Sequence, residues 1–76
     1  MKIINSSEFG KAIRNRRKEL GYTQNMVSEF TGFSISYLSD LENGKPTTEL
    51  GKAIYLANLL GIDLLMQERG SNFEQN

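Results

Sequence analysis

Cysteine and histidine are both absent from this chain of 76 residues. Without cysteine there are no disulfides and no thiolate metal ligands, and without histidine the usual zinc ligand and the commonest general base are missing. The sequence also has no glycine-rich phosphate loop and no spaced pair of carboxylates aimed at one site. We therefore expect no catalytic residue, no metal site and no cofactor, and the chain is predicted not to be an enzyme.

Long apolar runs are missing as well. No stretch approaches the roughly 18 apolar residues of a membrane span, and the N-terminus lacks the basic flank and apolar core of a secretory signal. These absences predict a cytoplasmic protein with no membrane partner. A domain of this length buries only about 60% of the surface that its unfolded chain exposes, so dimerisation is an expected source of additional stability.

The formal net charge is zero, with nine basic and nine acidic side chains, but the charges are unevenly distributed. Residues 1–18 contain six of the basic side chains and one acidic side chain, and the remaining residues contain three basic and eight acidic side chains. A basic segment of this kind attracts nucleic acid phosphates, but it can also be no more than the solvated face of a helix. Charge alone leaves both interpretations open.

Apolar spacing, polar caps and glycines predict four short helices, over residues of about 6–19, 24–31, 35–43 and 51–60. The first three have a capping residue in front and a glycine behind, namely Asn5, Thr23 and Ser34, then Gly21, Gly32 and Gly44. The fourth is apolar around most of its circumference, which is more than one small core can cover. The pattern predicts an all-α bundle of four to five short helices with an additional partner surface.

The segment after Gly61, residues 62–67, is too short for a helix and predicts a weak β-strand. A lone strand leaves its backbone groups unpaired, so its expected partner is its own copy in a second subunit, across a twofold axis. We thus expect a homodimer with these interface side chains: Leu59, Ile62, Leu64, Leu65 and Met66. Residues 1–68 are predicted to form one domain, and residues 69–76 a disordered polar tail.

The run from Thr23 to Lys45 resembles the Cro and repressor type of helix-turn-helix family, often called Xre-like. Thr23-Gln24 opens the second predicted helix, Gly32 makes the turn, and Asn43-Gly44-Lys45 closes the third helix. The resemblance extends over about residues 6–60. It implies a lambda-repressor-like fold that binds double-stranded DNA, with the third helix in the major groove.

The resemblance implies that the first turns of the third helix read base edges, through Ser34, Ile35, Ser36, Tyr37 and Ser39. Hydroxyls can donate to or accept from bases, and Ile35 can contact a thymine methyl group. For Tyr37, a partly buried ring packed beside the second helix is an equally good interpretation. Asp40 is expected to make no contact, because phosphates repel a carboxylate.

Phosphate contacts are implied for a second set, Arg14, Arg17, Gln24, Asn43 and Lys45. Gln24 lies in the first turn of a helix, where backbone N–H groups and the helix dipole attract phosphate. The alternative interpretation is that Gln24 is only a solvated residue of the first turn. In the family, Arg17 and Glu42 would form a structural ion pair between the first and third helices, with one edge of Arg17 also facing a phosphate.

A DNA-binding domain without a sensor region acts by occupying its site, so the sequence predicts a repressor that binds a palindromic operator as a homodimer. The short strand and polar tail after the fourth helix are similar in layout to HipB-type antitoxins. That layout implies a HipA-like kinase toxin as a partner and autoregulation of the operon. The alternative is a protein-interaction module that neutralises a partner without needing DNA.

Overall fold

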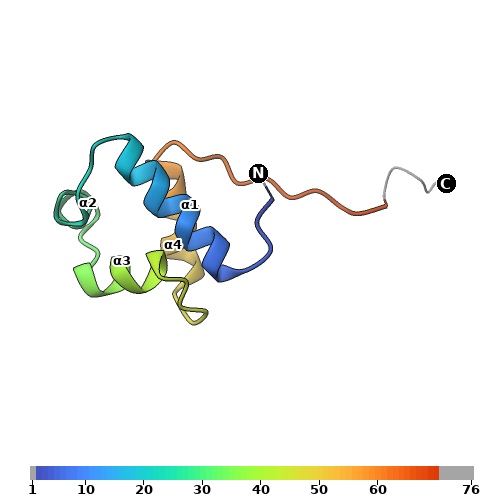
Figure 1. Ribbon diagram of the computed structural model, residues 1–76, viewed down its shortest axis with the longest axis horizontal. Helices are drawn as coiled ribbons and strands as arrows, with labels where there is room; N and C mark the ends of the chain where they lie inside the picture. The colour runs from blue at the N-terminus through green and yellow to red at the C-terminus, as the bar shows by residue number, and fades with distance from the viewer. Residues whose placement is uncertain (1, 71–76) are drawn as a thin grey trace.

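Four helices make up the bundle in the computed structural model, which describes residues 2–70. They are α1 (Ser6–Glu19), α2 (Gln24–Thr31), α3 (Ile35–Glu42) and α4 (Leu50–Leu59). Figure 1 shows them gathered at one end of the molecule, with the chain after α4 leading away from the bundle. Each observed boundary lies within one residue of the predicted one, so the helical part of the predicted fold is confirmed.

The helix starts are fixed by the caps that the sequence predicts. The side chain of Asn5 accepts a hydrogen bond from a backbone N–H in the first turn of α1, and Thr23 and Ser34 do the same for α2 and α3. These bonds satisfy N–H groups that have no partner inside the helix. α4 begins without such a bond, since its N-cap residue is Glu49 and makes no side-chain cap.

The core lies where the four helices face one another, and all four contribute side chains to it. Its buried members are Ile13, Val27, Leu38, Leu41, Ala53, Leu56, Ala57 and Leu60. Burial of these apolar side chains is the main favourable contribution to folding. The apolar positions that the core leaves uncovered are mostly on α4 and in the segment after it.

α1 crosses α3 at very close range. A Cβ atom at Gly10 would lie 2.3 Å from the carbonyl oxygen of Leu41, so only glycine fits at this crossing. Gly44, whose φ is +84°, lies against the backbone of Ser7, and the hydroxyl of Ser6 donates to the carbonyl of Gly44 at 2.8 Å. The N-terminal half of α1 thus fixes the position of the end of α3.

The predicted strand is not seen in the described chain: residues 62–68 form neither a helix nor a strand, and residues 2–70 contain no strand for them to pair with. A single copy of the chain supplies only one such segment, and a ladder needs two. Of the predicted tail, Arg69 and Gly70 form a turn, and the rest lies outside the described residues. The structure is therefore purely helical over residues 2–70.

Candidate nucleic-acid interface

The turn between α2 and α3 is held by hydrogen bonds from small polar side chains. The hydroxyl of Ser28 donates to the carbonyl of Phe33 at 2.6 Å, and that of Thr31 accepts from the N–H of Phe33 at 3.0 Å. Gly32 closes α2 in the left-handed conformation, with φ of +78°. Because these bonds lie close to the turn, α3 keeps a fixed direction relative to α2.

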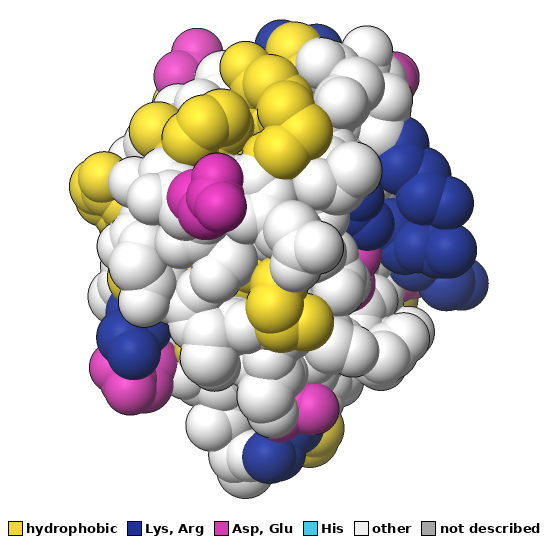
Figure 2. Space-filling view, turned by 90° about the vertical axis from the view of Figure 1, so that its left-hand side faces the viewer, with side chains coloured by type: hydrophobic (Ala, Val, Ile, Leu, Met, Phe, Trp, Pro, Cys, Tyr) yellow, Lys and Arg dark blue, Asp and Glu magenta, His cyan; other side chains and the backbone are white. Residues whose placement is uncertain are grey.

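The two sides of α3 have different environments. Leu38 and Leu41 point into the core and are almost completely buried, whereas Ser34, Ile35 and Ser36 are exposed. Figure 2 looks at this end of the molecule and shows basic side chains gathered along one edge of the view. The leading turn of α3 is therefore free to enter a groove while the opposite side of the helix packs in the bundle.

Tyr37 is partly buried and packs within the protein. Its ring meets the edge of Phe33, with centroids 5.5 Å apart, and its hydroxyl donates to the carbonyl of Glu49 at 3.0 Å. Burial raises the pKa of the Tyr37 phenol, and the charge of Glu49 raises it further, so the hydroxyl is protonated at neutral pH. A partly buried ring is one of the two interpretations left open above, and the contacts that hold it are with the turn and the start of α4, where that interpretation expected the second helix.

Two other residues of α3 have partners just after the end of the helix. Ser39 is half-buried, and its hydroxyl accepts from the amide of Asn43 at 3.4 Å. Asp40 forms an exposed ion pair with Lys45, with 3.4 Å between Nζ and Oδ2. Asp40 therefore has a cationic partner within the protein, in keeping with the expectation that it does not contact DNA.

The predicted ion pair between Arg17 and Glu42 is present and buried. The guanidinium donates to both carboxylate oxygens, at 2.6 and 2.9 Å, and also to the carbonyl of Tyr22 at 2.8 Å. The hydrogen bond to Glu42 raises the pKa of Arg17, against the lowering effect of burial. Gln24 completes the group by donating its amide to Glu42 at 3.1 Å. The group joins α1, α2 and α3, and it leaves little of Arg17 open to a phosphate.

The basic side chains of α1 divide into exposed and structural members. Lys11, Arg14 and Lys18 are exposed, and their spacing of three and four residues places them on one face. Arg16 instead donates from Nε to the carbonyl of Leu60 at 2.8 Å, at the end of α4. Nothing in the sequence pattern indicates this bond, because one arginine in a basic run looks like the next.

The sequence also matches a protein-family model, described as helix-turn-helix, over residues 13–66. The chain belongs to the helix-turn-helix family. It is 33% identical over 66 residues to the uncharacterized HTH-type transcriptional regulator y4mF of Sinorhizobium fredii (strain NBRC 101917 / NGR234), covering 84% of this chain and 87% of that protein. It is 31% identical over 62 residues to the ImmF control region 10 kDa protein of Bacillus phage phi105, covering 82% of this chain and 69% of that protein.

Solved structures share the fold. The HipB-O4 20mer complex superposes with a TM-score of 0.81 at 20% identity, over 91% of this chain and 97% of that one. A complex of a HipB variant with the O2 20mer gives the same TM-score and identity, over 91% of this chain and 96% of that one. Because the chain belongs to this family, it is a helix-turn-helix DNA-binding transcriptional regulator and not an enzyme.

Within residues 2–70, no group of three or more acidic side chains is placed to hold a metal ion. None of the helices in that range is long and apolar enough to cross a membrane.

The buried pair predicts a large loss of stability for Glu42→Ala. The variant leaves the Arg17 guanidinium buried without an anionic partner, which typically costs about 3–5 kcal/mol. Urea denaturation followed by circular dichroism measures this loss. The control is Glu19→Ala, which breaks the exposed pair with Arg16 and should cost less than about 1 kcal/mol. Equal stabilities for the two variants would contradict the role assigned to Glu42.

Proposed function

We propose that this protein is a sequence-specific repressor that binds a palindromic operator in double-stranded DNA as a homodimer. The proposal depends mainly on α3, whose leading turn is exposed while Leu38 and Leu41 anchor its other side in the core. A helix placed in this way can enter a major groove without loss of core packing. A domain bound at a promoter represses by excluding polymerase from it.

In this proposal the bases are read by the exposed side chains of the leading turn. The hydroxyls of Ser34 and Ser36 can donate to or accept from base edges, and Ile35 can contact a thymine methyl group. The turn carries no glutamine or arginine for bidentate contacts. Sequence-dependent DNA shape would then supply a larger share of the discrimination. Ser39 and Tyr37 are placed less directly, because both are partly buried, whereas Ser34 is exposed and its hydroxyl, which accepts from the N–H of Tyr37 as the cap of α3, can still donate to a base.

The phosphates are contacted on either side of that turn. Arg14 lies on the exposed basic face of α1, and Asn43 and Lys45 are exposed at the end of α3. Gln24 lies at the start of α2, where the backbone N–H groups and the helix dipole favour a phosphate even though its amide is bonded to Glu42. Arg17 contributes chiefly by fixing α1 on α3, since its side chain is buried.

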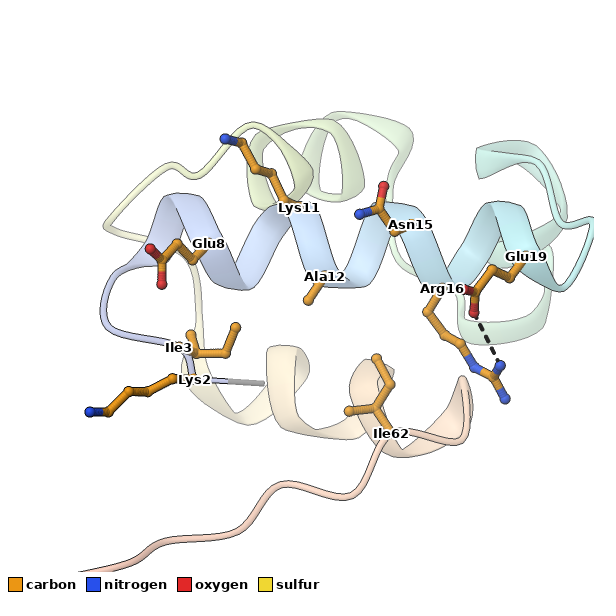
Figure 3. Close-up of a pocket in the computed structure, with 9 residues that line it drawn as sticks. All are labelled: Lys2, Ile3, Glu8, Lys11, Ala12, Asn15, Arg16, Glu19 and Ile62. Carbon is orange, nitrogen blue, oxygen red and sulfur yellow. Dashed lines mark hydrogen bonds and ion pairs between the residues drawn. The ribbon is translucent and has the colours of Figure 1, made fainter.

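The homodimer is supported by apolar surface that one copy leaves open. Leu59 and Leu64 are exposed, Leu65 is 89% exposed, and Met66 is fully exposed. Ile62 is partly buried against the core and lines an open pocket of about 440 Å³ beside α1. Figure 3 shows Ile62 and Ile3 facing this space below Ala12. A second copy that pairs residues 62–66 would cover these side chains.

The antitoxin role is a narrower form of the same proposal. The fold shared with the HipB complexes extends over 91% of this chain. A HipA-like kinase as partner stays a prediction from the layout of the segment after α4. The alternative of a protein-interaction module that needs no DNA is separated from the repressor by the binding experiment below.

The division into base and phosphate contacts predicts two classes of variant. Ile35→Ala and Ser36→Ala should reduce the preference for the operator over random duplex, by about 1–3 kcal/mol for each base pair that loses its contact. Arg14→Ala and Lys45→Ala should weaken binding to both duplexes alike and lessen its salt dependence.

Gel shifts at two salt concentrations, on an operator selected from random DNA, measure both effects. Equal losses on operator and random duplex for all four variants would contradict the assigned roles. Absence of any preferred duplex for the wild type at either salt concentration would favour the interaction module.

The homodimer predicts that polar substitutions in the segment after α4 weaken association. Leu65→Ser and Met66→Ser should shift sedimentation equilibrium toward the monomer, because each removes apolar area that the second copy would cover. Their folding should be unaffected, since both side chains are exposed and neither belongs to the core. Leu20→Ser removes an exposed leucine elsewhere and serves as the control. A wild-type chain that sediments as a monomer would overturn the proposal of strand pairing.

A further inference from the structure

A cluster of aromatic rings covers the side of the leading turn of α3 that faces α4. Phe33 lies at its centre, with the Tyr37 ring at 5.5 Å and the Tyr55 ring at 5.9 Å between centroids, both edge-on. Edge-on pairs at such distances are favourable beyond the area they bury. The cluster includes one residue from the turn, one from α3 and one from α4.

Lys52 of α4 completes the cluster. Its Nζ lies 5.4 Å from the centroid of the Phe33 ring and 5.3 Å from that of Tyr37, within the range of a cation–π interaction. The same ammonium pairs with Glu49 at 3.4 Å, and the carbonyl of Glu49 accepts the hydroxyl of Tyr37. The start of α4 is thus linked to the leading turn of α3 both by this hydrogen bond and by the ammonium of Lys52.

This cluster borders the buried core, because Phe33 and Tyr37 pack against the core while partly buried and Tyr55 is exposed. We expect it to contribute less to the stability of the bundle than the core does, since less of its apolar area is buried. Its members instead adjoin the turn that would carry the base contacts, where Ser34 and Ile35 are exposed. Recognition groups must be held within about 0.5 Å of their productive geometry by the residues behind them.

We propose that Lys52 and Tyr37 are positioning residues for base recognition, which set the angle of the leading turn of α3 without contacting the bases. The inference rests on the proposed DNA-binding function. It assigns a role in operator choice to Lys52, which lies on α4, outside the helix-turn-helix. It also gives Tyr37 a role in specificity that does not require its hydroxyl to reach a base.

The test uses the full chain and the duplex that the wild type selects from random DNA. Affinity is measured for that duplex, for each single base-pair substitution in it, and for a random duplex, with Lys52→Met and Tyr37→Phe beside the wild type. Methionine keeps a long unbranched side chain but removes the cation, and phenylalanine keeps the ring but removes the hydroxyl. Lys52→Arg retains a cation, and Tyr22→Phe removes a phenol hydroxyl remote from the leading turn.

Positioning predicts that both variants lower the ratio of specific to random affinity. The expected decrease is about three- to tenfold, which corresponds to the loss of one hydrogen bond or a contact of similar strength. The loss should be spread over every base pair that α3 reads, and affinity for the random duplex should stay unchanged. Lys52→Arg should restore most of the ratio, and Tyr22→Phe should match the wild type. The double variant should lose less than the product of the single losses, because both residues link the same two elements, the leading turn of α3 and the start of α4.

Other outcomes overturn the inference. A loss confined to one base pair and to Tyr37→Phe would make the tyrosine a direct reader. An equal loss on specific and random duplexes for Lys52→Met would make the lysine a phosphate contact. Unchanged profiles for both variants would show that the cluster does not position α3. A wild type that selects no duplex would contradict the proposed function itself, which distinguishes that failure from this one.

Discussion

Three helices of this protein meet at one buried carboxylate. Glu42, at the end of α3, receives hydrogen bonds from Arg17 of α1 and Gln24 of α2, and Arg17 also bonds the carbonyl of Tyr22 between them. A charge withdrawn from water is tolerated only when it is paired and its remaining acceptor sites are filled. The relative placement of α1, α2 and α3 satisfies this condition, so the geometry of the DNA-binding unit depends on it.

The same placement separates the two sides of α3. With its end fixed by Glu42 and by the close crossing at Gly10, the helix turns Leu38 and Leu41 to the core. At its leading turn the hydroxyl of Ser34 caps the helix, and Ser34, Ile35 and Ser36 are exposed. The proposed base contacts and the core contacts thus lie on opposite sides of one short helix.

The helix boundaries could be predicted because they depend on local chemistry. Capping side chains such as Thr23 and glycines such as Gly32 act within a few residues, so they can be identified from the sequence alone. The pair of Arg17 and Glu42 was also predicted, although it lies between distant segments, because its residues belong to a recognisable family pattern. The leading turn of α3 as a candidate reading surface followed from the same pattern.

Features of helix packing that lie outside the family pattern were not predicted. The need for glycine at position 10 arises only where the backbones of α1 and α3 cross, and the bond from Arg16 to Leu60 only where α1 passes the end of α4. For Tyr37 the sequence left two interpretations open, a base contact or a partly buried ring, because an amphipathic ring suits either environment. The predicted strand at residues 62–67 requires a second chain, so one copy does not form it.

The most direct test of the central claim is to follow backbone amide chemical shifts of the full chain by NMR while the selected duplex is added. The account predicts that the largest changes fall on Ser34–Tyr37 and on the end of α3 at Asn43–Lys45. Tight binding that leaves the amides of the leading turn unchanged, with the changes concentrated elsewhere on the bundle, would contradict it.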